Sequence, residues 1–97
     1  SRGLGDVYKR QIFSFTNENE SLVITPIDQY VIDAVRKERR AQKISQAMLA
    51  TGIGVSKGMI SQAESPKYNT KYNFSHINEI ARYLGCSPRD FLPQKPL

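Results

Sequence analysis

The side chains of this chain that could do chemistry are mostly basic and lie in its middle part. Eight Lys or Arg residues occur between residues 36 and 74, against only Glu38 and Glu64, so this segment has a local charge of +6. Residues 12–35 carry four carboxylates and no base, a local charge of −4. The middle segment therefore has the electrostatic character of a polyanion-binding surface, although an ordinary solvated face would have a similar composition.

Patterns typical of catalysis or metal binding are missing from the sequence. There is no glycine-rich phosphate loop, no histidine spaced against a nucleophile and no carboxylate pair in apolar surroundings. The single histidine, His76, lacks further ligands, so we expect it to cap a helix at the surface. The single cysteine, Cys86, excludes an internal disulfide and is expected to be a small core residue. We expect no enzyme activity, no cofactor and no metal.

Length and composition favour one small domain. The chain has 97 residues, of which 39% are hydrophobic and 24% charged, and this suits a single compact core. No apolar run approaches the roughly 20 residues that span a membrane, and no secretory signal pattern is present. We expect a cytoplasmic protein that makes no membrane contact.

The first eleven residues, SRGLGDVYKRQ, resemble a translated transposase sequencing adaptor, because the adaptor codons GAT GTG TAT AAG AGA CAG encode DVYKRQ in frame. We interpret residues 1–11 as a non-native leader; a genuine basic leader is the alternative. Without them the net charge of +5 falls to +3. Residues 12–24 would then form an N-terminal arm, or a short hairpin of the IFSF and LVI stretches, and residues 94–97 a tail.

A helix is expected from residue 25 to about Ala41. Thr25 suits the N-cap, Pro26 the first helical position, and Asp28 completes a capping box. Its apolar face comprises Ile27, Val31, Ala34 and Val35. Four cations lie near its end, where the helix dipole favours positive charge: Arg36, Lys37, Arg39 and Arg40. This preference explains the basic cluster whatever the protein binds.

The stretch SQAMLATGIGVSKGMISQAE, residues 45–64, holds two apolar stripes of helical period around a glycine. Ser45 and Ser56 suit the N-caps of two short helices whose starts lie eleven residues apart. The connection between them is only about three residues long and forces one residue towards positive φ, for which Gly54 is suited. Small Ala50 would then lie where the two helices cross.

Two more helices are expected after residue 73. The first has apolar residues at helical spacing, Phe74, Ile77, Ile80, Ala81 and Leu84, and Gly85 as its C-cap. The second, a fifth helix, begins with a capping box of Ser87 and Asp90, turns Phe91 and Leu92 inward, and ends at Pro93.

One set of residues in the middle stretch resembles, without a gap, the helix-turn-helix of the phage Cro and repressor type, the lambda-repressor-like DNA-binding domains. The set comprises Gln46, Ala50, Gly54, Val55, Ser56, Ile60 and Glu64. The similarity extends from Asp28 to Pro93, with LGCSPRDFL around a later helix. It implies an all-α, compact five-helix domain over residues 25–93, with an internal ion pair between Arg39 and Glu64.

The resemblance also implies which residues meet DNA. In this family the third helix, here about residues 56–64, lies in the major groove while the second crosses the backbone. The implied base-contacting residues are Lys57, Gly58, Ser61 and Gln62. The implied phosphate-contacting residues are Ser45, Gln46, Ser56, Ser65, Lys67 and Lys71. Lysine can donate to guanine and glutamine can pair with adenine, whereas glycine has no side chain to contact a base.

The chain departs from the family pattern after the third helix. Ser65-Pro66 stands where relatives often have Asn-Gly, and Pro66 disfavours a helical Ser65. The loop that follows, KYNTKYNF, is about three residues longer than in compact relatives. Its tyrosines, Tyr68 and Tyr72, either approach the nucleic-acid backbone or cap the core.

Taken together, these features predict a sequence-specific transcriptional regulator that binds double-stranded DNA, as a homodimer on two half-sites. The acidic segment 12–24 and the fifth helix are candidates for the dimer contact. The alternative is an antitoxin-type or adaptor-type module of the same fold, whose partner is a protein such as a toxin or part of the transcription machinery. RNA binding finds little support, since no platform of stacking aromatics is evident.

Overall fold

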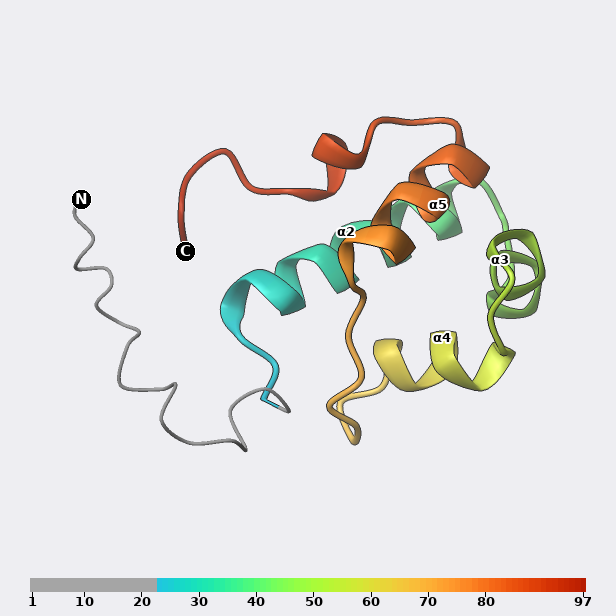
Figure 1. The fold of residues 1–97 in the computed structure, drawn as a ribbon, viewed down its shortest axis with the longest axis horizontal. Helices are drawn as coiled ribbons and strands as arrows, with labels where there is room; N and C mark the ends of the chain where they lie inside the picture. The colour runs from blue at the N-terminus through green and yellow to red at the C-terminus, as the bar shows by residue number, and fades with distance from the viewer. Residues whose placement is uncertain (1–22) are drawn as a thin grey trace.

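The computed structural model describes residues 23–97, which form four α-helices and one short 3₁₀ helix (Figure 1). In chain order these are α2 (Pro26–Ala41), α3 (Gln46–Ile53), α4 (Lys57–Glu64), α5 (Phe74–Leu84) and η3 (Pro88–Phe91). This part of the chain has no β-strand, so the all-α prediction is confirmed. The predicted arm or hairpin falls almost wholly outside the described residues. None of the described helices is long and apolar enough to cross a membrane.

The prediction of a fifth α-helix is wrong. The expected capping box does form, with the Ser87 amide 3.0 Å from the Asp90 carboxylate, but the turn it begins is a 3₁₀ helix of four residues. Leu92 is extended, at φ −109° and ψ 147°, because the ring of Pro93 disfavours a helical conformation in the residue before it. Phe91 is therefore buried as expected, while Leu92 is 43% exposed.

Every helix contributes to a single apolar core. Its most deeply buried side chains are Ile32, Val35, Leu49, Ile60, Ile80 and Phe91. Two residues expected in this core lie outside it, Ile27 at 44% exposure and Phe74 at 91%. Both occupy the first turn of a helix, where α2 and α5 begin. The helical period was thus correctly predicted for the later turns and failed in the first turn of α2 and of α5.

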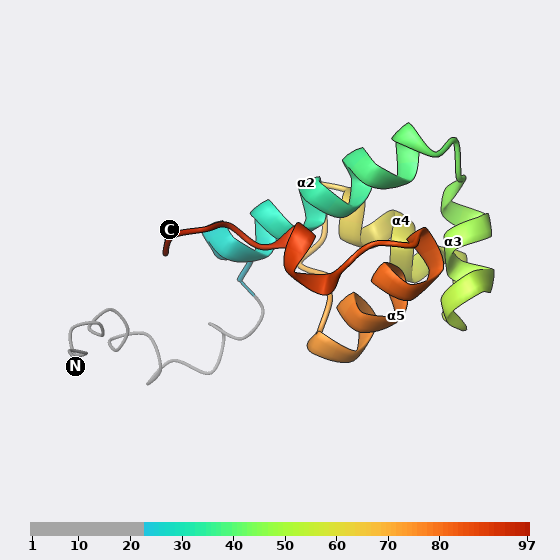
Figure 2. The same cartoon turned by 90° about the horizontal axis from the view of Figure 1, so that it is seen from above.

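The layering of the helices places α4 and η3 on opposite sides of α2. In Figure 1 η3 lies along the top of the molecule and α4 along the bottom, and the view from above in Figure 2 shows η3 in front with α4 behind. α2 packs against both of them, and α3 packs against α4 and α5. The molecule therefore has one surface formed by α3 and α4 and a separate one formed by α2 and η3.

The junction between α3 and α4 has the predicted geometry. Gly54 adopts φ 79° and ψ 30°, and its amide together with that of Val55 donates to the Ala50 carbonyl at 2.9 and 3.0 Å. Ser45 and Ser56 cap the two helices, since each hydroxyl accepts a hydrogen bond from the amide three residues later. Ala50 is 2% exposed. The two short helices are thus fixed at a tight, glycine-dependent turn.

Replacing Gly54 tests this turn. Because a side chain there meets no atom within 4 Å, Gly54→Ala is expected to lower the free energy of unfolding through backbone strain alone, by about 1 kcal/mol. Gly58→Ala is the matched control, since its added methyl group meets only the Ser56 hydroxyl at an ordinary contact distance of 3.8 Å, and it should raise stability by up to about 1 kcal/mol. Urea unfolding of both variants measures the difference; equal effects would contradict the assigned backbone at Gly54.

Candidate nucleic-acid interface

The α4 helix has one face in the core and one in solvent. Ile60, Ala63 and Glu64 are buried, whereas the face that carries the predicted base-contacting residues is open. On that face Lys57, Gly58 and Gln62 are exposed and Ser61 is half-buried. The helix is therefore anchored on one side and presents four predicted contact residues on the other.

The hydrogen-bonding groups on this open face are mostly available. Lys57 forms no ion pair within residues 23–97. The Ser61 hydroxyl donates to the Gly58 carbonyl at 3.1 Å, which leaves its oxygen able to accept. The Gln62 side-chain oxygen accepts from the Thr70 hydroxyl at 3.3 Å, while its amide nitrogen has no partner among the described residues. The open face therefore offers two hydrogen-bond donors, the Lys57 ammonium and the Gln62 side-chain amide.

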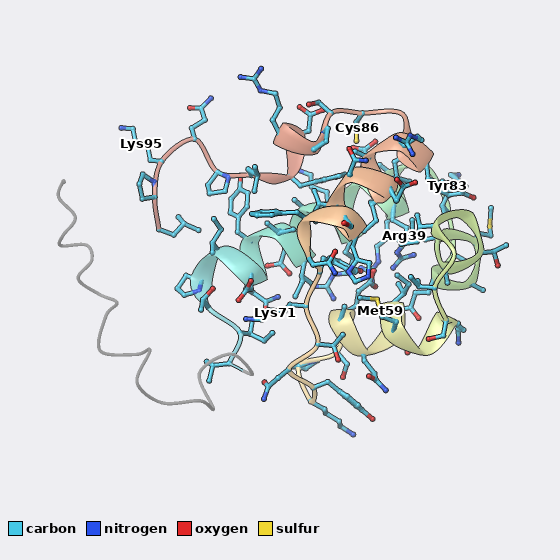
Figure 3. All side chains as sticks on the ribbon, viewed as in Figure 1. Arg39, Met59, Lys71, Tyr83, Cys86 and Lys95 are labelled. Atoms are coloured by element: carbon cyan, nitrogen blue, oxygen red, sulfur yellow. The ribbon has the colours of Figure 1, made fainter. Side chains whose placement is uncertain are left out.

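A buried ion pair joins the helices behind this face. Arg39 on α2 donates through Nε and Nη2 to the two carboxylate oxygens of Glu64 at 3.0 and 2.7 Å, and through Nη1 to the Ile44 carbonyl at 2.8 Å. Gln46, at the start of α3, donates to the same carboxylate at 3.0 Å. Figure 3 shows Arg39 among α2, α3 and α4. The predicted internal pair is confirmed.

This ion pair also determines the charge of the open face. Glu64 is the only acidic residue between Glu38 and Glu79, and its side chain is 3% exposed. Its carboxylate is directed inward and neutralised by Arg39, so the segment from 39 to 78 presents no unpaired carboxylate to solvent. A polyanion approaching α3 and α4 would meet lysine, serine and glutamine.

The predicted phosphate-contacting residues fall into two groups in the structure. Ser45, Ser56 and Lys67 are exposed, and Ser65 is half-buried. The Gln46 side-chain amide donates one hydrogen bond to the Glu64 carboxylate, as described above. Lys71 lies towards the start of α2 (Figure 3), 3.1 Å from the Asp28 carboxylate and 3.2 Å from the Val23 carbonyl. Gln46 and Lys71 therefore already donate to groups within the chain, whereas the Ser45, Ser56 and Ser65 hydroxyls accept backbone amide hydrogen bonds and can still donate to an anion.

The loop between α4 and α5 places its two tyrosines differently. Ser65 is extended at φ −97° and ψ 133°, as Pro66 predicts. Tyr72 is 9% exposed and belongs to the core, while Tyr68 is 44% exposed at the surface. Burial raises the pKa of the Tyr72 hydroxyl, and the nearby Glu64 carboxylate raises it further. Only Tyr68 can therefore approach a ligand.

Comparison with known proteins agrees with this geometry. A family model described as helix-turn-helix matches residues 35–91, which is more than half of the chain. This chain belongs to the helix-turn-helix family of the Cro and repressor type. No curated protein and no solved structure gives a significant match. The helix-turn-helix unit of this chain is α3, the turn at Gly54 and α4, and the family is one of DNA-binding transcription regulators.

Two features in and next to the helix-turn-helix unit were missed by the sequence analysis. Lys43, in the turn before α3, has a left-handed backbone with φ 61°, although no glycine or asparagine marks that position. Gly52 on α3 allows a close approach of α5, since a Cβ there would lie 2.4 Å from the Tyr83 ring, and Figure 3 shows Tyr83 beside α3. The sequence analysis assigned a role to Gly54 in the turn and none to Gly52, because close packing against another helix is not visible in the local sequence.

His76 is placed as expected, whereas Cys86, expected in the core, lies at its edge. The His76 Nδ1 atom accepts from the Asn73 amide at 3.1 Å and completes the capping box of α5. Cys86 is half-buried beside the core. Within residues 23–97 no group of three or more potential ligands could hold a metal ion.

The Arg39–Glu64 pair yields a stability prediction. Arg39→Met leaves Glu64 as a buried carboxylate without its cation, and such a loss costs about 3 to 5 kcal/mol in the free energy of unfolding. Arg39→Met combined with Glu64→Leu removes both charges and should recover much of this loss. Urea unfolding measures both. Arg82→Met, in the exposed pair with Glu79, is the control and should cost less than about 1 kcal/mol; a double variant no more stable than Arg39→Met would contradict the prediction.

Asp28 yields a pH prediction. Burial alone would raise its pKa, but hydrogen bonds from the Thr25 backbone and hydroxyl, with the Lys71 ammonium, outweigh burial and hold the pKa below its ordinary 3.8. The unfolded chain therefore binds more protons as the pH falls through this range, so this part of the stability is present above pH 3.8 and is lost in more acid solution. Asp28→Asn should flatten the decrease in unfolding free energy between about pH 4 and pH 2, measured by urea titration at each pH. An unchanged slope would contradict the assignment.

Proposed function

We propose that this protein is a transcriptional regulator that binds specific sequences of double-stranded DNA, with α4 in the major groove. The observation that carries the proposal is the division of α4 into a buried side and an open, acid-free side bearing Lys57, Gly58, Ser61 and Gln62. A helix used this way must be held firmly from behind while its polar side chains reach base edges. The buried side of α4 supports the first requirement, and its exposed polar side chains support the second.

The four outer residues would have distinct roles. The Lys57 ammonium suits the O6 and N7 acceptors of guanine, and the Gln62 amide suits the donor and acceptor of adenine. The Thr70 hydrogen bond to Gln62 orients the glutamine oxygen before DNA arrives. Ser61 can accept or donate and so selects less strongly. Gly58 contributes no side chain and would admit a base or methyl group close to the helix backbone.

The phosphate contacts would come from the ends of the two helices and the loop beyond them. The α3 and α4 N-termini present backbone amides near Ser45, Gln46 and Ser56, where helix dipoles favour an anion. Ser65 and Lys67 follow α4. Lys71 shares its ammonium with Asp28, so we expect a smaller contribution from Lys71 than from Lys67.

A dimer completes the proposed mode of binding. One helix-turn-helix unit offers few base contacts, so two copies on half-sites about 34 to 36 Å apart would be needed for high specificity. We propose residues 25–93 as the DNA-binding unit, with η3, in place of the expected fifth helix, or residues 12–24 as the contact between copies.

Substitutions on α4 test the base contacts. Lys57→Ala and Gln62→Ala should each weaken binding to the preferred duplex by about 1 to 3 kcal/mol and change binding to a scrambled duplex little. Lys67→Ala should weaken both duplexes alike, because phosphates carry no sequence information. Fluorescence anisotropy on the full chain measures these affinities, with Lys95→Ala in the tail as a neutral control. Equal losses on both duplexes for the α4 variants would exclude base contacts by these residues.

The salt dependence tests whether a polyanion is the ligand at all. Affinity should fall steeply as salt rises, because each lysine bound to a phosphate releases condensed counterions. Lys67→Ala should make the slope of log affinity against log salt shallower by about one. A flat response in the same anisotropy titration would contradict DNA binding and favour a protein partner for the fold.

A further inference from the structure

A groove on the side of the molecule remote from α4 has no role in the proposed DNA contact. It has a volume of about 580 Å³ and lies between α2 and the segment of residues 86–91. The α2 residues that line it include Tyr30, Ala34 and Lys37, which recur at helical spacing. One long face of α2 therefore forms one wall of the groove, and the η3 segment forms the other.

Apolar side chains lie in the groove and continue beyond it. Tyr30 is 41% exposed and Phe91 lies buried beneath the surface, with small Ala34 between the larger side chains of α2. Ile27, one turn before Tyr30, is 44% exposed, and Leu92 next to Phe91 is 43% exposed. Large exposed apolar side chains that gather around a concavity mark an interaction surface more often than scattered ones do.

The groove is acidic although the chain as a whole carries a net charge of +5. Three of the six Asp and Glu side chains within residues 23–97 line it, Asp33, Glu38 and Asp90, against the single cation Lys37. Asp33 is paired with Arg36 at 2.9 Å, whereas Glu38 and Asp90 have no cation partner among the described ion pairs.

Cys86 lines the groove together with two of these carboxylates, Glu38 and Asp90. Burial raises the pKa of this thiol, and the Glu38 and Asp90 carboxylates raise it further. Cys86 lines the groove, so the two carboxylates act on a group inside it. Glu38 and Asp90 therefore lie close enough to this groove-lining thiol to disfavour its ionised form.

We propose that this groove docks a short polypeptide segment of a partner protein, in which an apolar side chain is flanked by Lys or Arg. The apolar side chain would pack against Tyr30 and Ala34, and the flanking cations would meet Glu38 and Asp90. Apolar packing supplies affinity, and the complementary charge selects the partner.

The position of the groove makes this contact compatible with DNA. Figure 3 places Cys86 on the η3 side of the molecule and Met59 of α4 on the opposite side. A partner docked at Cys86 would therefore leave the outer face of α4 open. No residue belongs both to this groove and to the outer face of α4. Because η3 is also one of the two proposed dimer contacts, a partner docked here would leave residues 12–24 as the contact between copies.

Selection from a phage-displayed library of random 12-residue peptides, with the full chain as bait, tests the proposal. We expect enriched peptides to carry an apolar residue flanked by Lys or Arg. The most enriched one, synthesised with a fluorophore, should bind Glu38→Lys at least ten-fold more weakly than the unchanged chain. Glu79→Lys, an equal charge reversal on α5 and outside the groove, is the matched control and should bind like the unchanged chain.

Two further measurements show whether the peptide occupies the groove itself. The bound peptide should slow the reaction of Cys86, the only cysteine, with a thiol reagent, and should bind Lys57→Ala normally. Glu38→Lys should keep its DNA affinity within two-fold of that of the unchanged chain. A failure of the peptide proposal can therefore be distinguished from a failure of the DNA proposal. The proposal is overturned by absent enrichment, by enriched peptides without cations, or by equal losses in Glu38→Lys and Glu79→Lys. If the unchanged chain self-associates in sedimentation and Glu38→Lys abolishes this, the groove binds a second copy of the chain, and the proposal of a partner peptide is overturned.

Discussion

The structure depends on one buried ion pair, between Arg39 of α2 and Glu64 of α4. The arginine also holds the Ile44 carbonyl, and the carboxylate also accepts from Gln46, so four segments meet at one cluster. Burying two charges is expensive unless their remaining hydrogen bonds are satisfied, and here both are. The cluster fixes the end of α4 relative to the start of α3 and withdraws the one acidic side chain of the region from its surface. Position and charge of the open face therefore have a common cause.

The other end of the helix pair is fixed by backbone conformation. Gly54 takes a left-handed turn that other residues adopt only with strain, and Ser45 and Ser56 cap the N-termini of the two helices. Neither eight-residue helix would be stable alone in water, so their geometry comes from the junction, the core and the ion pair together. On the proposed account, this rigidity allows Lys57 and Gln62 to discriminate base pairs, since a loosely held helix would lose the geometry on which paired hydrogen bonds depend.

Local signals in the sequence predicted much of this arrangement and failed where distant contacts decide. Thr25, Ser45, Ser56 and Gly54 were predictable because capping and positive φ are properties of a few adjacent residues. The exposure of Phe74 was not predictable, because helical spacing shows which residues share one face of a helix but not where the neighbouring helices end. The prediction of a fifth α-helix failed because a capping box shows where a helix starts but not how long it is. The effect of Pro93 on Leu92 limits this helix to a single short turn. The α2–η3 groove joins residues 30–38 to residues 86–91, which are far apart in the sequence, and no local pattern marks it.

The central claim is that the outer face of α4 contacts base pairs, and it is tested most directly by selecting binding sites from random duplexes with the unchanged chain and with Gln62→Lys. A lysine at this position should exchange a preference for adenine for one for guanine. The account predicts two consensus sequences that differ at one position of each half-site and agree elsewhere. Identical consensus sequences, or no consensus from either protein at low salt, would contradict it.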